Sequence, residues 1–150
     1  MYSRIMVAID SDFAQGQVLD TAIELARLCG ARLAVCHALD ETILANRTAG
    51  VWLSEGVAPA ERQLADGALT FLEAAAEVAR AAGIDVDVRL VRSEAEHAAE
   101  MIARAAAEWR ADLLVAGAHN RQGIERFFVG SFAEQLVRKA GVSLLLVRGA

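Results

Sequence analysis

The stretch VAGAHNRQGIERFFVGSFAEQLVR, residues 115–138, decides how the whole chain is interpreted. An apolar run ends at Gly117, a polar loop follows, and Gly130 and Ser131 begin a segment whose apolar residues recur at helical spacing. The first N–H groups of a helix have no intrahelical partner and, together with the helix dipole, attract an anion. We therefore interpret Gly130 and Ser131 as a seat for a phosphate group, although an ordinary helix start also explains them.

Strands and helices alternate along the rest of the chain. Short apolar runs predict buried strands, whereas longer segments with apolar residues on one face predict helices. The predicted strands span residues 4–9, 33–39, 85–91, 112–117 and 143–147, and the predicted helices span residues 18–29, 64–83, 94–109 and 130–139. This order predicts an α/β fold with a five-stranded parallel sheet and helices on both of its faces.

In parallel sheets of this kind, ligands bind beyond the carboxyl ends of the strands, where the winding reverses. Asp10, Ala38 and Gly117 are predicted to end the first, second and fourth strands at that edge. The third strand alternates apolar and polar residues, which predicts a position at the edge of the sheet. Ser93 is predicted to be the N-cap of the helix that follows that strand.

Residues 40–61 show no clear periodicity. Gly50, Gly56 and Pro59 favour a long loop or a broken helical piece, and such loops are often functional. Trp52 within this segment has two interpretations: it caps the core, or it belongs to a flap over a ligand.

Length and composition limit the classes of function. The chain has 150 residues, 55% of them hydrophobic, which predicts one domain with one core. It contains no apolar run of the roughly 18 residues that a membrane span requires, so we expect a soluble, cytoplasmic protein. The net charge of -5 argues against duplex DNA as the main partner. Residues 110–150 nevertheless contain more basic than acidic side chains, which suits a small phosphorylated ligand.

The cysteines and histidines predict no metal site. Cys29 and Cys36 match neither a metal knuckle nor a redox pair and are expected to be reduced core thiols. The histidines are dispersed: His37 is expected to be a hydrogen-bonded core residue and His97 a surface residue. His119 lies in the loop after the fourth strand, where it either contacts a phosphate or is solvated.

The spacing around the loop resembles a known signature. Gly117, Gly130 and Ser131 fit the nucleotide-binding signature of the universal stress protein family, which is a glycine, two residues, a glycine, nine residues, a glycine and a Ser or Thr. Asn120 replaces the second glycine, and Asn tolerates the left-handed conformation well. The segments VAID, LAVCHAL, ADLLVAGAH, GSFAEQLVR and SLLLVR also occur in the order expected for that family, so the resemblance covers essentially residues 1–150 as one domain.

The resemblance implies the strand order 3-2-1-4-5, the Rossmann-like fold of the adenine nucleotide alpha hydrolases, and a bound adenine nucleotide such as ATP or AMP. It implies that Asp10 and Ala38 hold the base, that Ala8 lines the edge of the base, and that Ala116 and Gly117 lie near the ribose. The residues that the resemblance implies at the phosphates are Asn120, Gly130, Ser131 and Phe132. His119, Arg121 and Arg126 lie in the same loop and are further polar or cationic candidates.

Asp12 adds a second carboxylate close to the implied site, because Ser11-Asp12 follows Asp10 where relatives often have Gly-Ser. This carboxylate either repels phosphate or helps to hold Mg²⁺. The sequence leaves both interpretations open.

Motifs of dedicated catalysis are missing: the chain has no G-x-x-x-x-G-K-[ST] loop, no G-x-G-x-x-G after the first strand and no G-x-S-x-G elbow. Three hypotheses follow, in order of preference. The first is a nucleotide-binding regulatory module of the stress response, the second a ligand-free dimeric scaffold, and the third a weak ATPase. In the family that the chain resembles, a two-fold homodimer commonly forms at the last strand, which here is Ser143–Val147.

Overall fold

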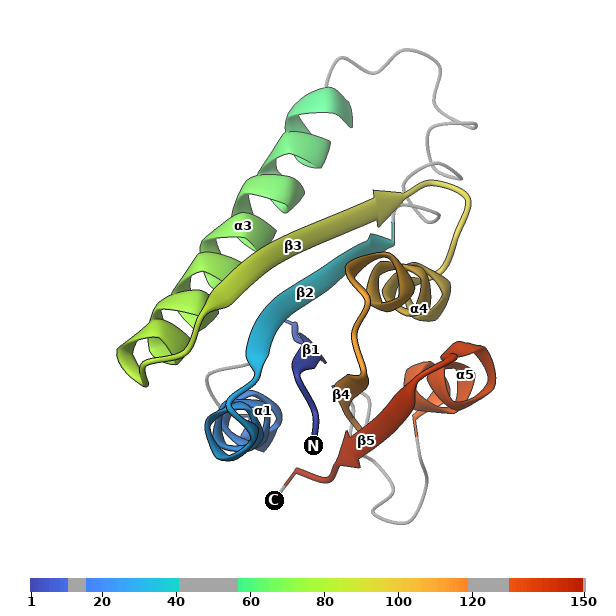
Figure 1. Ribbon diagram of the computed structural model, residues 1–150. Helices are drawn as coiled ribbons and strands as arrows, with labels where there is room; N and C mark the ends of the chain where they lie inside the picture. Colours follow the sequence, from blue (N-terminus) through green and yellow to red (C-terminus); the bar gives the residue numbers. More distant parts are fainter. Residues whose placement is uncertain (11–15, 41–56, 119–129, 150) are drawn as a thin grey trace.

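The computed structural model describes residues 1–10, 16–40, 57–118 and 130–149. Five parallel strands form one sheet in the order β3-β2-β1-β4-β5, which confirms the predicted fold class and strand order. Helices α1 and α3 cover one face of the sheet, and α4 and α5 cover the other (Figure 1). The elements follow one another as β1 (Arg4–Ala8), α1 (Gln17–Cys29), β2 (Arg32–Asp40), α3 (Val57–Ala81), β3 (Val86–Ser93), α4 (Ala98–Trp109), β4 (Leu113–Gly117), α5 (Ser131–Lys139) and β5 (Ser143–Val147).

The sheet separates two apolar cores. Successive side chains of a strand point to opposite faces, so a central strand that is apolar throughout supplies both cores. In β1, Ile5 and Val7 pack in the core beneath α1 and α3, whereas Met6 packs in the core beneath α4 and α5. These three side chains have no solvent-exposed surface. The nearly continuous apolar strands of the sequence therefore have the buried position that was predicted.

Helix α1 ends as predicted, because Gly30 adopts a left-handed conformation with φ 65° and its N–H donates to the carbonyl oxygens of the last turn. Cys29 is half-buried and Cys36 is buried, and both thiols are free. Burial raises the pKa of the Cys36 thiol to about 12. A thiol in this state is a poor nucleophile, in agreement with the predicted role in the core.

Two predicted helix starts are wrong. Helix α3 begins at Val57, inside the segment that was predicted as a loop or a broken helical piece, and not at Leu64. Pro59 occupies its first turn, where the missing N–H of proline costs little. Helix α4 begins at Ala98 rather than at residue 94. The Ser93 hydroxyl does accept hydrogen bonds from the N–H groups of residues 95 and 96, but this closes a turn that precedes the helix.

Asp87 of β3 has polar partners at the edge of the sheet. The carboxylate of Asp87 accepts hydrogen bonds from the guanidinium of Arg32, at 2.7 Å, and from the indole N–H of Trp109, at 2.9 Å. The guanidinium of Arg4 lies over the Trp109 ring, 4.0 Å from its centroid. Asp87 therefore links strands β2 and β3 to the C-terminal end of α4.

Stability should fall in acid because of Asp87. The hydrogen bond from Arg32, followed by that from Trp109, lowers the pKa of this carboxyl from its ordinary 3.8 to about 2. A carboxyl whose pKa is lowered by folding stabilises the native state above its unfolded pKa and loses this contribution as the pH falls through its folded pKa. Urea unfolding of the wild type should therefore show declining stability from about pH 4 to about pH 2, more weakly at high salt because the side chain is 36% exposed.

The Asp87→Asn variant should be less stable than the wild type near neutral pH and should show a smaller decline in that acid range. Asp66→Asn is the matched control, because Asp66 lies exposed on α3 away from this network. Equal acid dependence in the wild type and in Asp87→Asn would contradict this assignment.

Candidate functional site

Ala118, which follows β4, is hydrogen-bonded both to β5 and to the residue before α5. The Ala118 N–H donates to the Val147 carbonyl oxygen of β5, and the Ala118 carbonyl oxygen accepts from the Gly130 N–H, both at 2.8 Å. Ala118 is also buried. These two hydrogen bonds of Ala118 fix the start of α5 beside the carboxyl ends of β4 and β5.

The N-terminus of α5 has the geometry of an anion seat. Gly130 is its N-cap, with φ -62° and ψ 157°, and the first intrahelical hydrogen bond runs from the Glu134 N–H to the Gly130 carbonyl oxygen at 3.0 Å. The N–H groups of Ser131, Phe132 and residue 133 thus come before the helical hydrogen-bond pattern begins. Gly130 makes no side-chain cap, and Ser131 is exposed to solvent. These N–H groups and the positive end of the dipole together favour a phosphate there.

Small side chains line the neighbouring strands on the same face of the sheet. Ala8 is paired with Cys36, and Val7 with Val115, so Ala8 and Ala116 lie at one level of adjacent strands. Ala8, Ala38 and Phe132 are partly buried against the core beneath α4 and α5, and Ala116 is fully buried in it. The structure therefore brings these four predicted residues to one face of the sheet.

The ends of several strands differ from prediction by one or two residues. Ala38 does not end its strand, because β2 continues to Asp40, paired with Ser93 of β3. Strand β1 ends at Ala8, but the Ile9 N–H still donates to the Cys36 carbonyl oxygen of β2 at 2.9 Å. Asp10 follows directly after Ile9. Asp10 is exposed at the carboxyl edge of the sheet. Gly117, paired with Val147, does end β4 at that edge.

Several predicted site residues lie outside the described residues: His119, Asn120, Arg121, Arg126 and Asp12, as does Trp52. Their predicted contacts with a nucleotide stay predictions. Within the described part of the chain, acidic, histidine and cysteine side chains form no group of three that could hold a metal ion.

The other histidines have structural contacts. The His37 Nδ1 atom lies 2.7 Å from the Ile9 carbonyl oxygen, so this nitrogen must carry the proton and donate. The prediction of a hydrogen-bonded histidine is confirmed, but the side chain is half-buried rather than fully in the core. His97 is the N-cap residue of α4, is 63% exposed, and its Nδ1 lies 3.0 Å from the Asp40 carboxylate.

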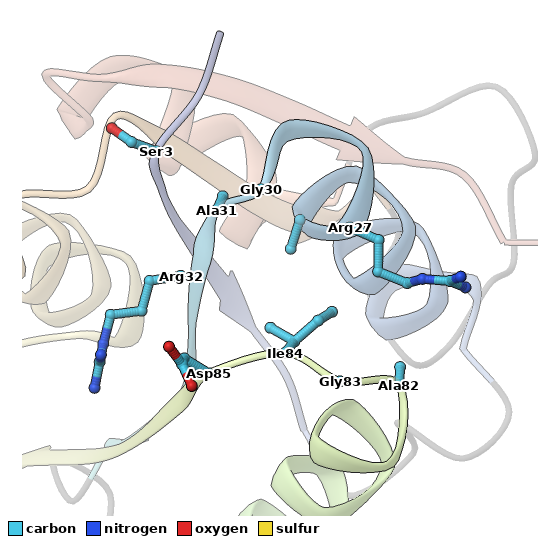
Figure 2. A pocket seen from close by; sticks show the side chains of 10 residues that line it. Ser3, Arg27, Gly30, Ala31, Arg32, Ala82, Gly83, Ile84 and Asp85 are labelled. Atoms are coloured by element: carbon cyan, nitrogen blue, oxygen red, sulfur yellow. The ribbon is translucent and has the colours of Figure 1, made fainter.

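A hollow of about 540 Å³ lies at the opposite, amino edge of the sheet, between the C-terminal ends of α1 and α3. Figure 2 shows the side chains of Arg27 and Arg32 directed away from each other at its borders. Arg32 is also paired with Asp87. Since no pair of cations converges on this hollow, we assign the candidate site to the carboxyl edge, where the N-terminus of α5 lies.

The arrangement defines a class of protein: a doubly wound parallel sheet with an anion-attracting helix N-terminus at the carboxyl edge. The model of the universal stress protein family matches residues 1–148, and the chain belongs to that family. Among the described helices, none is long and apolar enough to cross a bilayer.

Related proteins support this assignment along the whole chain. A putative universal stress protein of Staphylococcus aureus (strain USA300) is 29% identical, over 98% of this chain and 84% of the relative. The crystal structure of a universal stress family protein from Burkholderia pseudomallei is 29% identical with a TM-score of 0.74, covering 97% of this chain and 96% of that chain. The universal stress protein of Archaeoglobus fulgidus in complex with dAMP is 27% identical with a TM-score of 0.62, covering 97% of both chains.

Proposed function

We propose that this protein binds an adenine nucleotide at the carboxyl edge of the sheet and acts as a nucleotide-dependent regulatory module in the stress response. The observation that carries the proposal is the N-terminus of α5, which the hydrogen bond from Gly130 to Ala118 fixes beside β4. The dAMP complex of the Archaeoglobus fulgidus relative supports an adenine nucleotide as the ligand.

In the proposed complex, each part of the nucleotide has a counterpart among the described residues. The phosphates meet the N–H groups of Ser131 and Phe132, whose positions follow from the N-cap Gly130. The base lies on the face that carries Ala8 and Ala38, near Asp10. A carboxylate accepts hydrogen bonds only, so Asp10 would receive them from the amino group of adenine or from a ribose hydroxyl.

Binding should be visible as a gain in stability. A ligand that binds only the native state, at about 100 times its dissociation constant, raises the free energy of unfolding by about 2.7 kcal/mol. We expect this gain with ATP, ADP or AMP in thermal unfolding, and we expect mass spectrometry to detect an adenine nucleotide released from denatured purified protein. No thermal shift with any of the three at millimolar concentration would contradict the proposal.

A second candidate is a dimeric scaffold that needs no nucleotide. The observation that favours it is β5, a short apolar strand at the edge of the sheet whose residues from Leu144 to Val147 are only partly buried. An edge strand offers unpaired backbone groups to a second chain. We propose that two copies pair through Ser143–Val147. Sedimentation velocity with and without ATP separates the candidates: a dimer without any nucleotide effect favours the scaffold, and a monomer throughout contradicts the pairing.

Slow hydrolysis of bound ATP is the third candidate. Asp10 and Asp12 are the carboxylates that would help to position Mg²⁺ for this reaction. Of the two, Asp12 lies outside the described residues. Phosphate release above that of a variant unable to bind nucleotide would support this activity.

A further inference from the structure

A cavity of about 460 Å³ opens at the carboxyl edge of the sheet on the face opposite to the candidate nucleotide site. Strand β2 supplies His37 and Leu39 to its wall, helix α3 supplies Leu64, Gly67 and Phe71, and Asp10 lies at its border. We propose that this cavity is a second ligand site, and that it takes a small aromatic molecule carrying an amine or another cationic group.

The sheet itself separates this cavity from the proposed nucleotide site. Neighbouring residues of β2 point to opposite faces, so Ala38 lies against the core beneath α4 and α5, whereas His37 and Leu39 reach the side of α3. Phe71 likewise packs against the core beneath α1 and α3. Asp10, which follows the last residues of β1, borders the cavity and is the residue that both sites share.

The walls are mainly apolar and contain two rings. The rings of His37 and Phe71 meet edge to face, with centroids 4.8 Å apart and planes at 79°. The hydrogen bond from His37 Nδ1 to the Ile9 carbonyl oxygen fixes the orientation of the imidazole. Leu64 is 53% exposed although it is a large apolar side chain, and its place in the cavity wall accounts for this. Apolar walls with a few fixed polar groups are typical of small-molecule sites, as is this volume.

Gly67 contributes to the shape of the cavity. It lies inside the 25-residue helix α3, where glycine is less favourable than alanine. Its φ is not in the positive range that would require glycine, and a Cβ atom at this position would meet no atom within 4 Å. Neither backbone conformation nor close packing requires the glycine. Its physical effect is to leave the cavity open at the point where Gly67 forms part of the wall.

The charge at the border selects the class of ligand. Asp10 is an exposed carboxylate, and a carboxylate can accept several hydrogen bonds at once. It attracts a cationic or donor group and repels a second carboxylate. The rings and leucine side chains favour an aromatic body, so the ligand that fits both features is an aromatic amine of one or two rings.

Tryptamine, indole and indole-3-acetate test this proposal, because they share a ring system and differ in charge. In titrations of ¹⁵N-labelled protein followed by NMR, tryptamine should cause saturable shifts of the amides of Gly67, Ala68 and Phe71. Tryptamine should bind at least about threefold more tightly than indole-3-acetate. The exposed Asp10 carboxylate attracts the ammonium group of tryptamine and repels the carboxylate of indole-3-acetate. No saturable shift with tryptamine, or tighter binding of indole-3-acetate, would overturn the proposal.

Filling the cavity provides the matched variants. Gly67→Leu should weaken tryptamine binding by more than about tenfold, because the side chain occupies the cavity, and should leave ATP binding unchanged. Gly141→Leu is the control, because Gly141 is remote from the cavity and a Cβ there also meets open space. Tryptamine binding by Gly67→Leu at the wild-type affinity would overturn the site. If Gly67→Leu does not fold, the Asp10→Asn variant provides the test. Loss of the preference for tryptamine over indole-3-acetate in this variant supports the assigned ligand class, and an unchanged preference overturns it.

Discussion

Gly130→Asp should abolish nucleotide binding while the protein remains folded. Gly130 is the N-cap of α5 with φ -62° and ψ 157°, a conformation that any residue adopts, so the substitution introduces no backbone strain. Aspartate is moreover a favourable N-cap, because its carboxylate accepts hydrogen bonds from the N–H groups of the first turn. Those are the N–H groups that the phosphates require. The carboxylate should therefore occupy the phosphate seat and repel the ligand, and isothermal titration with ATP should show a loss of affinity of at least about a hundredfold, or about 2.7 kcal/mol.

Two variants separate the charge from other effects. Gly130→Ala has the same backbone and no carboxylate, so it should retain most of the ATP affinity if the seat is formed by backbone groups. Gly141→Asp places the same carboxylate beyond the other end of α5, where a Cβ meets open space, and should bind ATP as the wild type does. Wild-type affinity in Gly130→Asp would show that phosphate does not bind at this helix end, and the proposed function would lose its main support.

The buried parallel strands and the position of α5 were predictable because they rest on local signals, whereas the strand order was predicted from the resemblance to the family. Continuous apolar runs such as Leu113–Gly117 identify buried parallel strands, and the alternation of strands with helices restricts the topology. Gly30 ends α1 in the left-handed conformation that a glycine after a helix predicts. In these places the local sequence preference and the fold agree.

The helix starts were harder to predict, because a capping residue can close a turn as well as a helix. Ser93 accepts two backbone hydrogen bonds as a cap does, but the helix begins only at Ala98, after His97. In the sequence, Pro59 favours a loop or a broken helical piece, but a helix tolerates proline in its first turn, where Pro59 lies in α3. Both signals are ambiguous until the neighbouring elements are in place.

The cavity beside His37 was not predicted from sequence. It depends on Leu64, a large apolar side chain that is exposed, and on the contact between His37 and Phe71 from separate elements. Such a contact depends on how α3 lies across β2, and no local pattern reports that. The single signal available was Gly67, a glycine inside a long helix without a role at either end.

Leu136→Ala should cause the largest loss of stability among the predicted variants, about 2–5 kcal/mol. Leu136 has no exposed surface, and it is one of the two buried residues of α5 together with Ala133. Stability of small domains is about 5–15 kcal/mol in total, so this loss should lower the urea midpoint strongly. Leu28→Ala removes the same atoms from a side chain that is 80% exposed, and its urea midpoint should stay close to that of the wild type.

The loss should also reach the candidate site, because α5 has only nine residues and helices of this length are not stable in water by themselves. The packing of Leu136 beneath the helix therefore holds the first-turn N–H groups in place. In Leu136→Ala, amide hydrogen exchange should accelerate in α5 more than in α3, and ATP affinity should fall even where the protein remains folded. The contrary result would be equal acceleration of amide exchange in α3 and α5 with unchanged ATP affinity. Leu136 would then support the fold as a whole, and the hydrogen bond between Gly130 and Ala118 alone would hold the phosphate seat.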